Sequence, residues 1–509
     1  MNIGDCIRKW SEISPRKVAV IDTGREFTYL ELNKRCNQVA NFLLKKGIRK
    51  GERVGVLLHN SHEYLEIYLA LTKIGAILVP LNWRMAPPEA GNILNDCEAS
   101  YLFFEEAFFD TAAHVRDNVE TIASYVSVGG ESLAWADNYE KVKECSSDEP
   151  TGFLKPDLED PHLILYTSGT TGFPKGAVLS SRKTFFNALN ANIFYRLTPE
   201  DIFLVSRPLF HSGGLLVDST PALYTGATVI YKKRFSPGEY LETIEADRAT
   251  IIETSAAFLN FILKECDVSR YNLSSLKSYY TGGERVPLTL LKEYHSLGIP
   301  LSQIFGMTET SIVTWLSTAD AVRKAGSVGK PVLHGEIMID NGDMQMIGPG
   351  EIGEVVVKGP ILMTGYWNKP EVTREAMRNG WFHTGDLATI DNEGFISIVD
   401  REKDMFISGG ENVYPAEVET LLLQHPKVLD VAVYGVPDER WGEVGKASIV
   451  MKEGEELNPA ELDHFLGSKI GRFKIPRHYE FVNELPRTAT GKILKNILAQ
   501  GSKKEVPSI

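Results

Sequence analysis

The sequence predicts an α/β protein with a large N-terminal part and a small α+β C-terminal domain. Three observations support this prediction. Segments typical of strands alternate with segments typical of helices over the first two thirds of the 509 residues, which indicates largely parallel sheets. After about Gly335 glycine-rich strand segments follow, which favours antiparallel strands or a small barrel. A charged stretch at 400–404 then precedes a unit of about 105 residues, enough for an independent domain.

The alternation begins near the N-terminus. The segment from Thr28 to Lys46 has a helical pattern, with Thr28 as N-cap and Glu31 completing a capping box. Hydrophobic runs predict further strands at 18–21, 52–58, 76–79, 227–231 and 250–252, and helices at 61–74, 237–246 and 255–264. Repeated strand–helix units of this kind predict an α/β fold.

The domain boundaries follow from the change in pattern. Strand segments at 354–358 and 394–399 end the N-terminal domain, which we place at residues 1–399. Residues 400–404 form the connection, and 405–509 form the C-terminal domain. Within it, strands near 428–434 and 447–451 and a helix at 459–470 predict a βαβ-like unit.

Composition excludes several classes of protein. Hydrophobic residues make up 43% and charged residues 24%, as in ordinary globular chains, which argues against disorder. The net charge of −13 argues against a nucleic-acid binder. The five cysteines are scattered, so neither a disulfide framework nor structural zinc is expected, and a reducing cytoplasm fits. No segment predicts a signal peptide or a membrane span, although peripheral membrane contact stays open.

One segment of the C-terminal domain is basic. Between Lys469 and Lys495 there are seven basic residues and two acidic ones. This segment is interpreted either as a solvated surface or as a face that meets phosphates.

The strongest chemical signal is the glycine-rich segment Tyr166–Gly176, which reads YTSGTTGFPKG. It follows an apolar strand, and we expect a helix after it. Its glycines allow backbone N–H groups to turn inward, its hydroxyls add donors, and Lys175 adds a positive charge. These groups suit a polyphosphate, although the segment lacks the GK[ST] ending of a Walker loop.

Together with other motifs, this segment closely resembles the adenylate-forming superfamily of acyl-CoA synthetases, luciferases and nonribosomal-peptide adenylation domains. The resemblance covers nearly the whole chain. The further motifs, in family order, are PLFHSGG (208–214), TGGE (281–284), FGMTE (305–309), TGD (384–386), DREKD (400–404) with SGGEN (408–412), and PRTATGK (486–492). Seven motifs in this order indicate membership rather than chance.

The resemblance implies a fold and a reaction. The N-terminal domain should contain two α/β subdomains and a small β-barrel-like subdomain, followed by a mobile C-terminal domain. A carboxylate attacks the α-phosphorus of ATP to give an acyl-adenylate, and coenzyme A then displaces AMP. Because two anions must approach each other, cations and oriented dipoles, with Mg²⁺, should carry catalysis.

The resemblance also assigns the nucleotide site. Asp386 and Arg401 should bind the ribose, Glu309 should hold Mg²⁺, and Thr308 should donate to the α-phosphate. Without the resemblance, Asp386 would be interpreted as a turn aspartate, Arg401 as a surface charge and Glu309 as an acid at the start of a helix. The remaining expected ATP-binding residues are Thr167, Ser168, Gly169, Thr170, Thr171, Gly172, Lys175, Gly283, Glu284, Gln303 and Phe305, together with Lys492.

Further residues should serve catalysis and the thiol. Lys492 should bridge the carboxylate and the α-phosphate, and Lys403 should be the hinge about which the C-terminal domain rotates. Gly409 and Gly410 should line the path of coenzyme A. His211 should gate the acyl pocket, although a lone histidine is more often structural. The last motif also fits the Pro-x4-Gly-Lys pattern of relatives silenced by lysine acetylation, so a lysine acetyltransferase is an expected partner.

The acyl pocket is expected near seven small or apolar residues: Ala256, Phe258, Gly283, Ile304, Gly306, Met307 and Val313. None of them is charged, which favours an apolar fatty, branched or aryl acid. Ile304 stands where most relatives have glycine, so it either narrows the pocket or points into the core. Two rival functions remain: an enzyme that loads an acyl carrier protein, and a catalytically silent nucleotide-binding protein.

Overall fold

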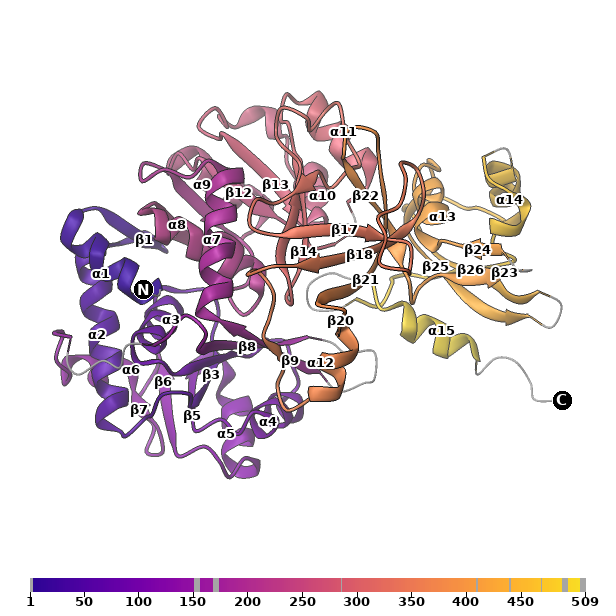
Figure 1. Cartoon of the computed structure of the whole chain (residues 1–509). Coiled ribbons are helices and arrows are strands. Elements are labelled where there is room, and N and C mark those ends of the chain that lie inside the picture. Colours follow the sequence, from indigo (N-terminus) through magenta and orange to yellow (C-terminus); the bar gives the residue numbers. More distant parts are fainter. Residues whose placement is uncertain are drawn as a thin grey trace.

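The computed structural model describes residues 3–150, 156–167, 174–284, 286–408, 411–438, 441–467, 469–487 and 493–503. Four sheets organise them (Figure 1). Two large sheets belong to the N-terminal part, a five-stranded sheet follows, and a second five-stranded sheet lies in the C-terminal region. The C-terminal strands and helices form the yellow lobe in Figure 1.

The nine-stranded sheet has the order β16-β15-β14-β13-β12-β10-β11-β1-β2. Its central strands are parallel, as the alternating pattern predicts. Its strands are β1 (Val18–Asp22), β2 (Arg25–Thr28), β10 (Ile202–Val205), β11 (Thr228–Tyr231), β12 (Ile251–Thr254), β13 (Ser278–Gly282), β14 (Ser302–Met307), β15 (Ser311–Trp315) and β16 (Lys330–Pro331).

The eight-stranded sheet has the order β19-β9-β8-β4-β3-β5-β6-β7 and is also largely parallel. Its strands are β3 (Arg53–Leu57), β4 (Ile77–Pro80), β5 (Tyr101–Glu105), β6 (Ser124–Val128), β7 (Asp137–Asn138), β8 (Pro161–Thr167), β9 (Lys175–Ser180) and β19 (Gly365–Tyr366). The expectation of a helix directly after the glycine-rich segment is wrong. Strand β9 follows and pairs antiparallel with β8, and α7 begins only at Ser181.

The two smaller sheets are mainly antiparallel, which the sequence predicted for the first of them only. The first contains β17 (Glu336–Asp340), β18 (Gly353–Lys358), β20 (Met377–Arg378), β21 (Trp381–Ile390) and β22 (Ile396–Arg401). The second contains β23 (Phe406–Ser408), β24 (Glu411–Val413), β25 (Val428–Asp438), β26 (Gly442–Met451) and β27 (His478–Phe481). The predicted βαβ-like unit is shifted by one strand. Strands β25 and β26 are antiparallel neighbours, whereas β26 and β27 are parallel and joined through α14.

Helices cover the sheets. Those described are α1 (Ile3–Ile13), α2 (Tyr29–Lys45), α3 (His62–Ile74), α4 (Pro87–Asp96), α5 (Phe109–Asn118), α6 (Tyr139–Glu144), α7 (Ser181–Tyr195), α8 (Thr220–Thr225), α9 (Pro237–Ala246), α10 (Ala256–Glu265), α11 (Leu288–Ser296), α12 (Pro370–Ala376), α13 (Pro415–Leu422), α14 (Pro459–Gly467) and α15 (Lys495–Lys503). The capping box of α2 is confirmed, because Thr28 Oγ1 accepts from Glu31 N and the Glu31 carboxylate accepts from Thr28 N. Among the described residues, no helix has the length and apolarity to span a membrane.

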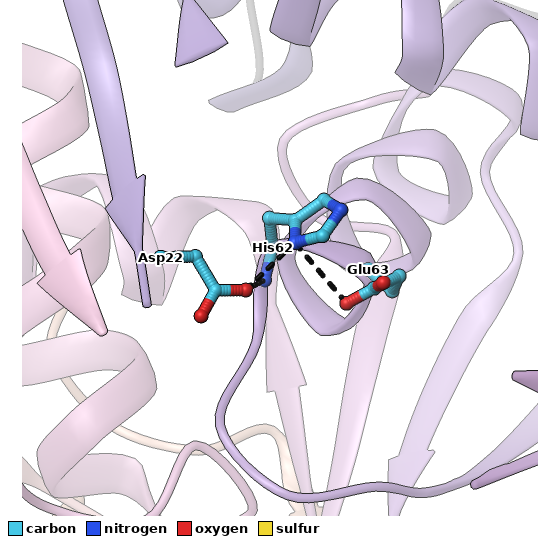
Figure 2. A group of neighbouring side chains, drawn as sticks. All are labelled: Asp22, His62 and Glu63. Atoms are coloured by element: carbon cyan, nitrogen blue, oxygen red, sulfur yellow. Dashed lines mark hydrogen bonds and ion pairs between the residues drawn. The ribbon is translucent and has the colours of Figure 1, made fainter. Parts of the chain in front are cut away.

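A buried polar trio ties α3 to the end of β1 (Figure 2). The Asp22 carboxylate accepts from the backbone N of His62 at 3.0 Å and from its Nδ1 at 2.7 Å. Glu63 lies 3.3 Å from the same Nδ1, and Phe27 stacks on the imidazole at 4.3 Å. These contacts fix the start of α3 against the end of β1.

Candidate active site

Four neighbouring strand ends bring predicted site residues to one edge of the nine-stranded sheet. Strands β10, β12, β13 and β14 are parallel and lie side by side in this order. Ligands of open α/β sheets bind beyond the carboxyl ends of such strands. The segments that leave these ends are 206–214, the start of α10, 283–284 and the turn at 308–310.

Glu309 lies in the turn between β14 and β15 and is only 5% exposed. The hydroxyl of Tyr366 donates to its Oε1 at 2.9 Å, and Met363 N donates to its backbone carbonyl at 2.7 Å. Burial and the Glu309 charge raise the pKa of the Tyr366 phenol, which therefore stays protonated. Lys175 Nζ lies 5.6 Å from the centroid of the same ring. The end of the glycine-rich segment and the Thr–Glu turn thus meet at Tyr366.

Two buried side chains of α7 hold the Thr–Glu hairpin from behind. Lys183 Nζ donates to Ser311 Oγ, and Asn187 Oδ1 accepts from Ile312 N at 3.4 Å. Asn187 Nδ2 also donates to Leu216 O at 2.6 Å, which joins the hairpin to the segment after His211. Burial lowers the pKa of Lys183 to about 7, while the charge of Glu309 opposes this shift. Sequence reasoning missed Lys183 and Tyr366.

Asp386 and Arg401 form the second part of the site. Arg401 Nε lies 2.9 Å from Asp386 Oδ1, across neighbouring antiparallel strands. A local hydrogen bond fixes the backbone at Asp386, because Thr384 Oγ1 accepts from Asp386 N at 3.0 Å. Glu354 Oε1 accepts from Gly385 N at 2.9 Å. The carboxylate that the motif predicted for the ribose is thus rigidly held and 4% exposed.

Lys403 interacts electrostatically with residues of both parts of the site. Partial burial and the positive charge of Arg401 lower the pKa of Lys403. Asp386 opposes this shift, whereas the charge of Lys175 adds to it. The predicted hinge lysine, the predicted ribose pair and the end of the glycine-rich segment therefore interact electrostatically in this arrangement.

The residues predicted for the nucleotide base lie at the ends of β13 and β14. Gly283 has φ +79°, a backbone conformation that favours glycine. Glu284 Oε1 accepts from Ala257 N at 3.1 Å and so caps the start of α10. Gln303 Oε1 is buried and accepts no hydrogen bond from the described residues. Phe305 and Thr308 are half-buried. Elsewhere, Thr167 Oγ1 donates to Lys175 O at 3.4 Å, at the base of the β8–β9 hairpin.

The residues predicted for the acyl pocket are largely packed. Ile304 is 5% exposed and Val313 is fully buried, and both belong to the central hydrophobic core. A Cβ on Gly306 would lie 2.0 Å from Ser311 O, so β15 fills this space. The side of Gly306 that faces β15 therefore offers no room for a ligand.

The other four candidates sit closer to the strand ends, and Gly283 among them is described above. Ala256 is 4% exposed at the start of α10, and the Phe258 ring packs against Tyr240 at 5.2 Å. Met307 is half-buried at the end of β14.

His211 precedes a π-helix, Gly213–Ser219, and π-helices often occur at functional sites. Burial lowers the pKa of His211 to about 4, with further contributions from Arg207 and Arg84. The imidazole is therefore neutral at neutral pH. It contacts Phe210, with ring centroids 4.6 Å apart.

Several predicted site residues lie outside the described residues: Ser168, Gly169, Thr170, Thr171, Gly172, Gly409, Gly410 and Lys492. The described part of the site nevertheless combines a buried carboxylate, an Asp–Arg ion pair and lysines from two segments. This combination is typical of enzymes that bind and activate a nucleotide.

Comparison with known proteins supports this class. The family model described as "AMP-binding enzyme" matches residues 7–367, and the model "AMP-binding enzyme C-terminal domain" matches 417–492. An indoleacetate–CoA ligase from Aromatoleum aromaticum is 38% identical over 501 residues, covering 98% of both chains. A feruloyl-CoA synthase from Amycolatopsis sp. is 39% identical over 486 residues, covering 95% of this chain and 96% of that protein.

Solved structures agree. o-Succinylbenzoate CoA synthetase from Bacillus subtilis, in complex with its acyl-adenylate intermediate, has a TM-score of 0.87 and 31% identity, covering 97% of each chain. ATP-bound MatB from Rhodopseudomonas palustris has a TM-score of 0.90 and 29% identity, covering 99% of each chain.

The chain belongs to the AMP-binding enzyme family. The predicted adenylate-forming fold is confirmed, and so is the predicted class, AMP-forming acyl-CoA ligases that use ATP, Mg²⁺ and coenzyme A. The relatives named here give no support to loading of a carrier protein.

Proposed function

We propose that this enzyme joins an apolar carboxylic acid, fatty, branched or aryl, to coenzyme A through an acyl-adenylate. The observation that carries the proposal is the meeting of Lys175 and Glu309 at Tyr366. Lys403 interacts electrostatically with Asp386 and Arg401, and also with Lys175. A carboxylate for a metal, cations for phosphates and an acceptor for ribose hydroxyls are the groups that adenylation of an acid requires.

In the first half-reaction, the ribose would be held by Asp386 and Arg401, and the phosphates would be met by Lys175 and Thr308. The buried carboxylate of Glu309 fits a magnesium ion, because among the residues that the structure describes only its Oε1 is hydrogen-bonded, to Tyr366. Bound Mg²⁺ would supply neutralisation of phosphate charge. Lys492 would then bring the carboxylate and the α-phosphate together.

In the second half-reaction, the C-terminal domain would rotate about Lys403. This movement removes Lys492 and places Gly409 and Gly410 along the path of the thiol. The neutral imidazole of His211 would gate the way to the acyl group, since an uncharged ring can move in an apolar pocket at lower cost.

Regulation and location complete the proposal. Acetylation of Lys492 by a lysine acetyltransferase would remove the charge needed for adenylation. Scattered cysteines fit a cytoplasmic enzyme.

The proposal is tested by acid-dependent pyrophosphate release over a panel of alkyl and aryl acids, with coenzyme A and an acyl carrier protein offered in parallel. We expect release with some of these acids and thioester formation on coenzyme A. Transfer to the carrier protein alone would replace the proposal with the carrier-loading function. Absence of release with every acid would favour a catalytically silent nucleotide-binding protein.

A further inference from the structure

Arg207 reaches the same edge of the sheet from a position that no motif analysis singled out. It follows β10 by two residues, and its side chain extends over the ends of β12 and β13. Its Nε lies 2.5 Å from Glu253 Oε2, and its Nη2 donates to the carbonyl of Gly282. The side chain is 18% exposed, while that of Glu253 is 1% exposed. The guanidinium is thus anchored through Nε and Nη2, and the side chain as a whole is partly exposed.

Two glycines leave the room that the guanidinium occupies. A Cβ on Gly213 would lie 2.9 Å from Arg207 Cδ. A Cβ on Gly283 would lie 3.0 Å from Arg207 Nη1, and Gly283 itself is exposed. Nη1 donates no hydrogen bond to the residues that the structure describes. One donor of a fixed cation therefore lies beside the accessible backbone that follows β13.

An acidic side chain already faces the guanidinium of Arg207. Glu253 Oε2 lies 2.5 Å from Nε, and the Glu253 side chain is 1% exposed. Burial raises the pKa of Glu253, whereas the charge of Arg207 lowers it. Burial and the charge of Glu253 raise the pKa of Asp218, in the π-helix, well above its usual range. Because the buried Glu253 already occupies one side of the guanidinium, a neutral acceptor fits Nη1 better than a second anion does.

We propose that Arg207 is a specificity-determining residue whose Nη1 donates a hydrogen bond to the acyl substrate. The preferred acid then carries one neutral acceptor oxygen, such as a hydroxyl, ether or carbonyl oxygen, on an otherwise apolar tail. This proposal rests on the proposed function and names the substrate class more narrowly. A tail without an acceptor would cover Nη1 and leave a buried donor unsatisfied, which disfavours it by roughly 10- to 100-fold.

The test compares three acids of similar shape: cinnamate, 4-hydroxycinnamate and 4-carboxycinnamate. The kcat/KM of thioester formation is measured for the wild type and for Arg207→Met combined with Glu253→Gln, which removes both charges of the pair. Arg35→Met is the control for loss of a buried arginine elsewhere in the fold, since Arg35 forms a comparably buried pair with Glu66, with exposures of 20% and 0%. Arg207→Lys is measured as well, because it keeps the charge but loses the planar fork of donors.

We expect the wild type and Arg35→Met to prefer 4-hydroxycinnamate over cinnamate by roughly 10- to 100-fold. In the double variant and in Arg207→Lys, that ratio should fall close to one. A wild-type ratio near one, or an unchanged ratio in a folded Arg207→Lys enzyme, would overturn the proposal. Preference for 4-carboxycinnamate would overturn the inference that the acceptor on the substrate is neutral. Failure of the proposed function itself would look different, because no acid of any kind would then release pyrophosphate.

Discussion

Asp386 and Arg401 are register partners on the neighbouring strands β21 and β22, and Arg401 Nε lies 2.9 Å from Asp386 Oδ1. The two residues are brought together by antiparallel pairing of neighbouring strands. Arg401 is also the last residue of its strand, directly before the turn that carries Lys403. The pair therefore connects the predicted ribose site with the predicted hinge.

The first prediction concerns this pair. Asp386→Asn keeps the shape of the side chain but removes the charge that attracts Arg401 and accepts from ribose hydroxyls. We expect the KM for ATP to rise about 10- to 100-fold, because hydrogen bonds to charged groups are among the stronger ones. Steady-state kinetics with ATP as the varied substrate measures this effect. An unchanged KM for ATP would show that Asp386 does not bind the nucleotide.

The second prediction concerns Lys492. Lys492→Ala should slow adenylate formation by on the order of 10²–10³, the usual loss for one transition-state electrostatic contact. It should spare thioester formation from a supplied acyl-adenylate, because the lysine has then left the site. Enzyme acetylated at Lys492 should behave in the same way. Equal loss of both half-reactions in Lys492→Ala would contradict the assignment.

The third prediction tests Lys403 as the hinge. Proline locks φ near −65° and removes the backbone donor. In the structure, Glu402 N donates to Gly385 O and Asp404 N donates to Arg401 O. Among the described residues, no hydrogen bond from the N of Lys403 is present, so proline breaks no bond here. Lys403→Pro should keep adenylation and lose thioester formation. Wild-type overall turnover would place the hinge elsewhere.

The fourth prediction separates the two interpretations of Ile304. Because Ile304 is buried in the central core, Ile304→Ala should destabilise the fold by about 2–5 kcal/mol. If the side chain also narrows the acyl pocket, the ranking of acids should shift toward bulkier ones. Ile339→Ala, in the same core but on β17, is the control for packing alone. An unchanged ranking in a folded Ile304→Ala enzyme would leave Ile304 as a packing residue.

Sequence reasoning succeeded where the determinants are local. The capping box of Thr28 and Glu31 spans three residues, so it could be predicted before the helix was seen. The Thr-Gly-Asp motif lies within β21, and it is held by one hydrogen bond between neighbouring residues and one from the adjacent strand β18; its role as a site stays a prediction. The parallel sheets followed from the alternation of strands and helices.

It failed where contacts join distant parts of the chain. Tyr366 reaches Glu309 only because β19 pairs with β9, and Lys183 reaches Ser311 only because α7 packs behind the hairpin. Strand β9 was missed because its pairing with β8 overrides the helical expectation for the segment after the glycines. Arg207 carries no local signal at all, since its partners lie on β12 and β13.

The most direct measurement is the stoichiometry of the complete reaction. The purified chain is incubated with ATP, Mg²⁺, coenzyme A and a turnover-competent acid, and the nucleotides and thioester are quantified by chromatography and mass spectrometry. An AMP-forming acid–CoA ligase should yield AMP, pyrophosphate and acyl-CoA in equal amounts, and none of them when the acid is left out. Production of ADP and phosphate, or of AMP without any acyl-CoA, would contradict the account.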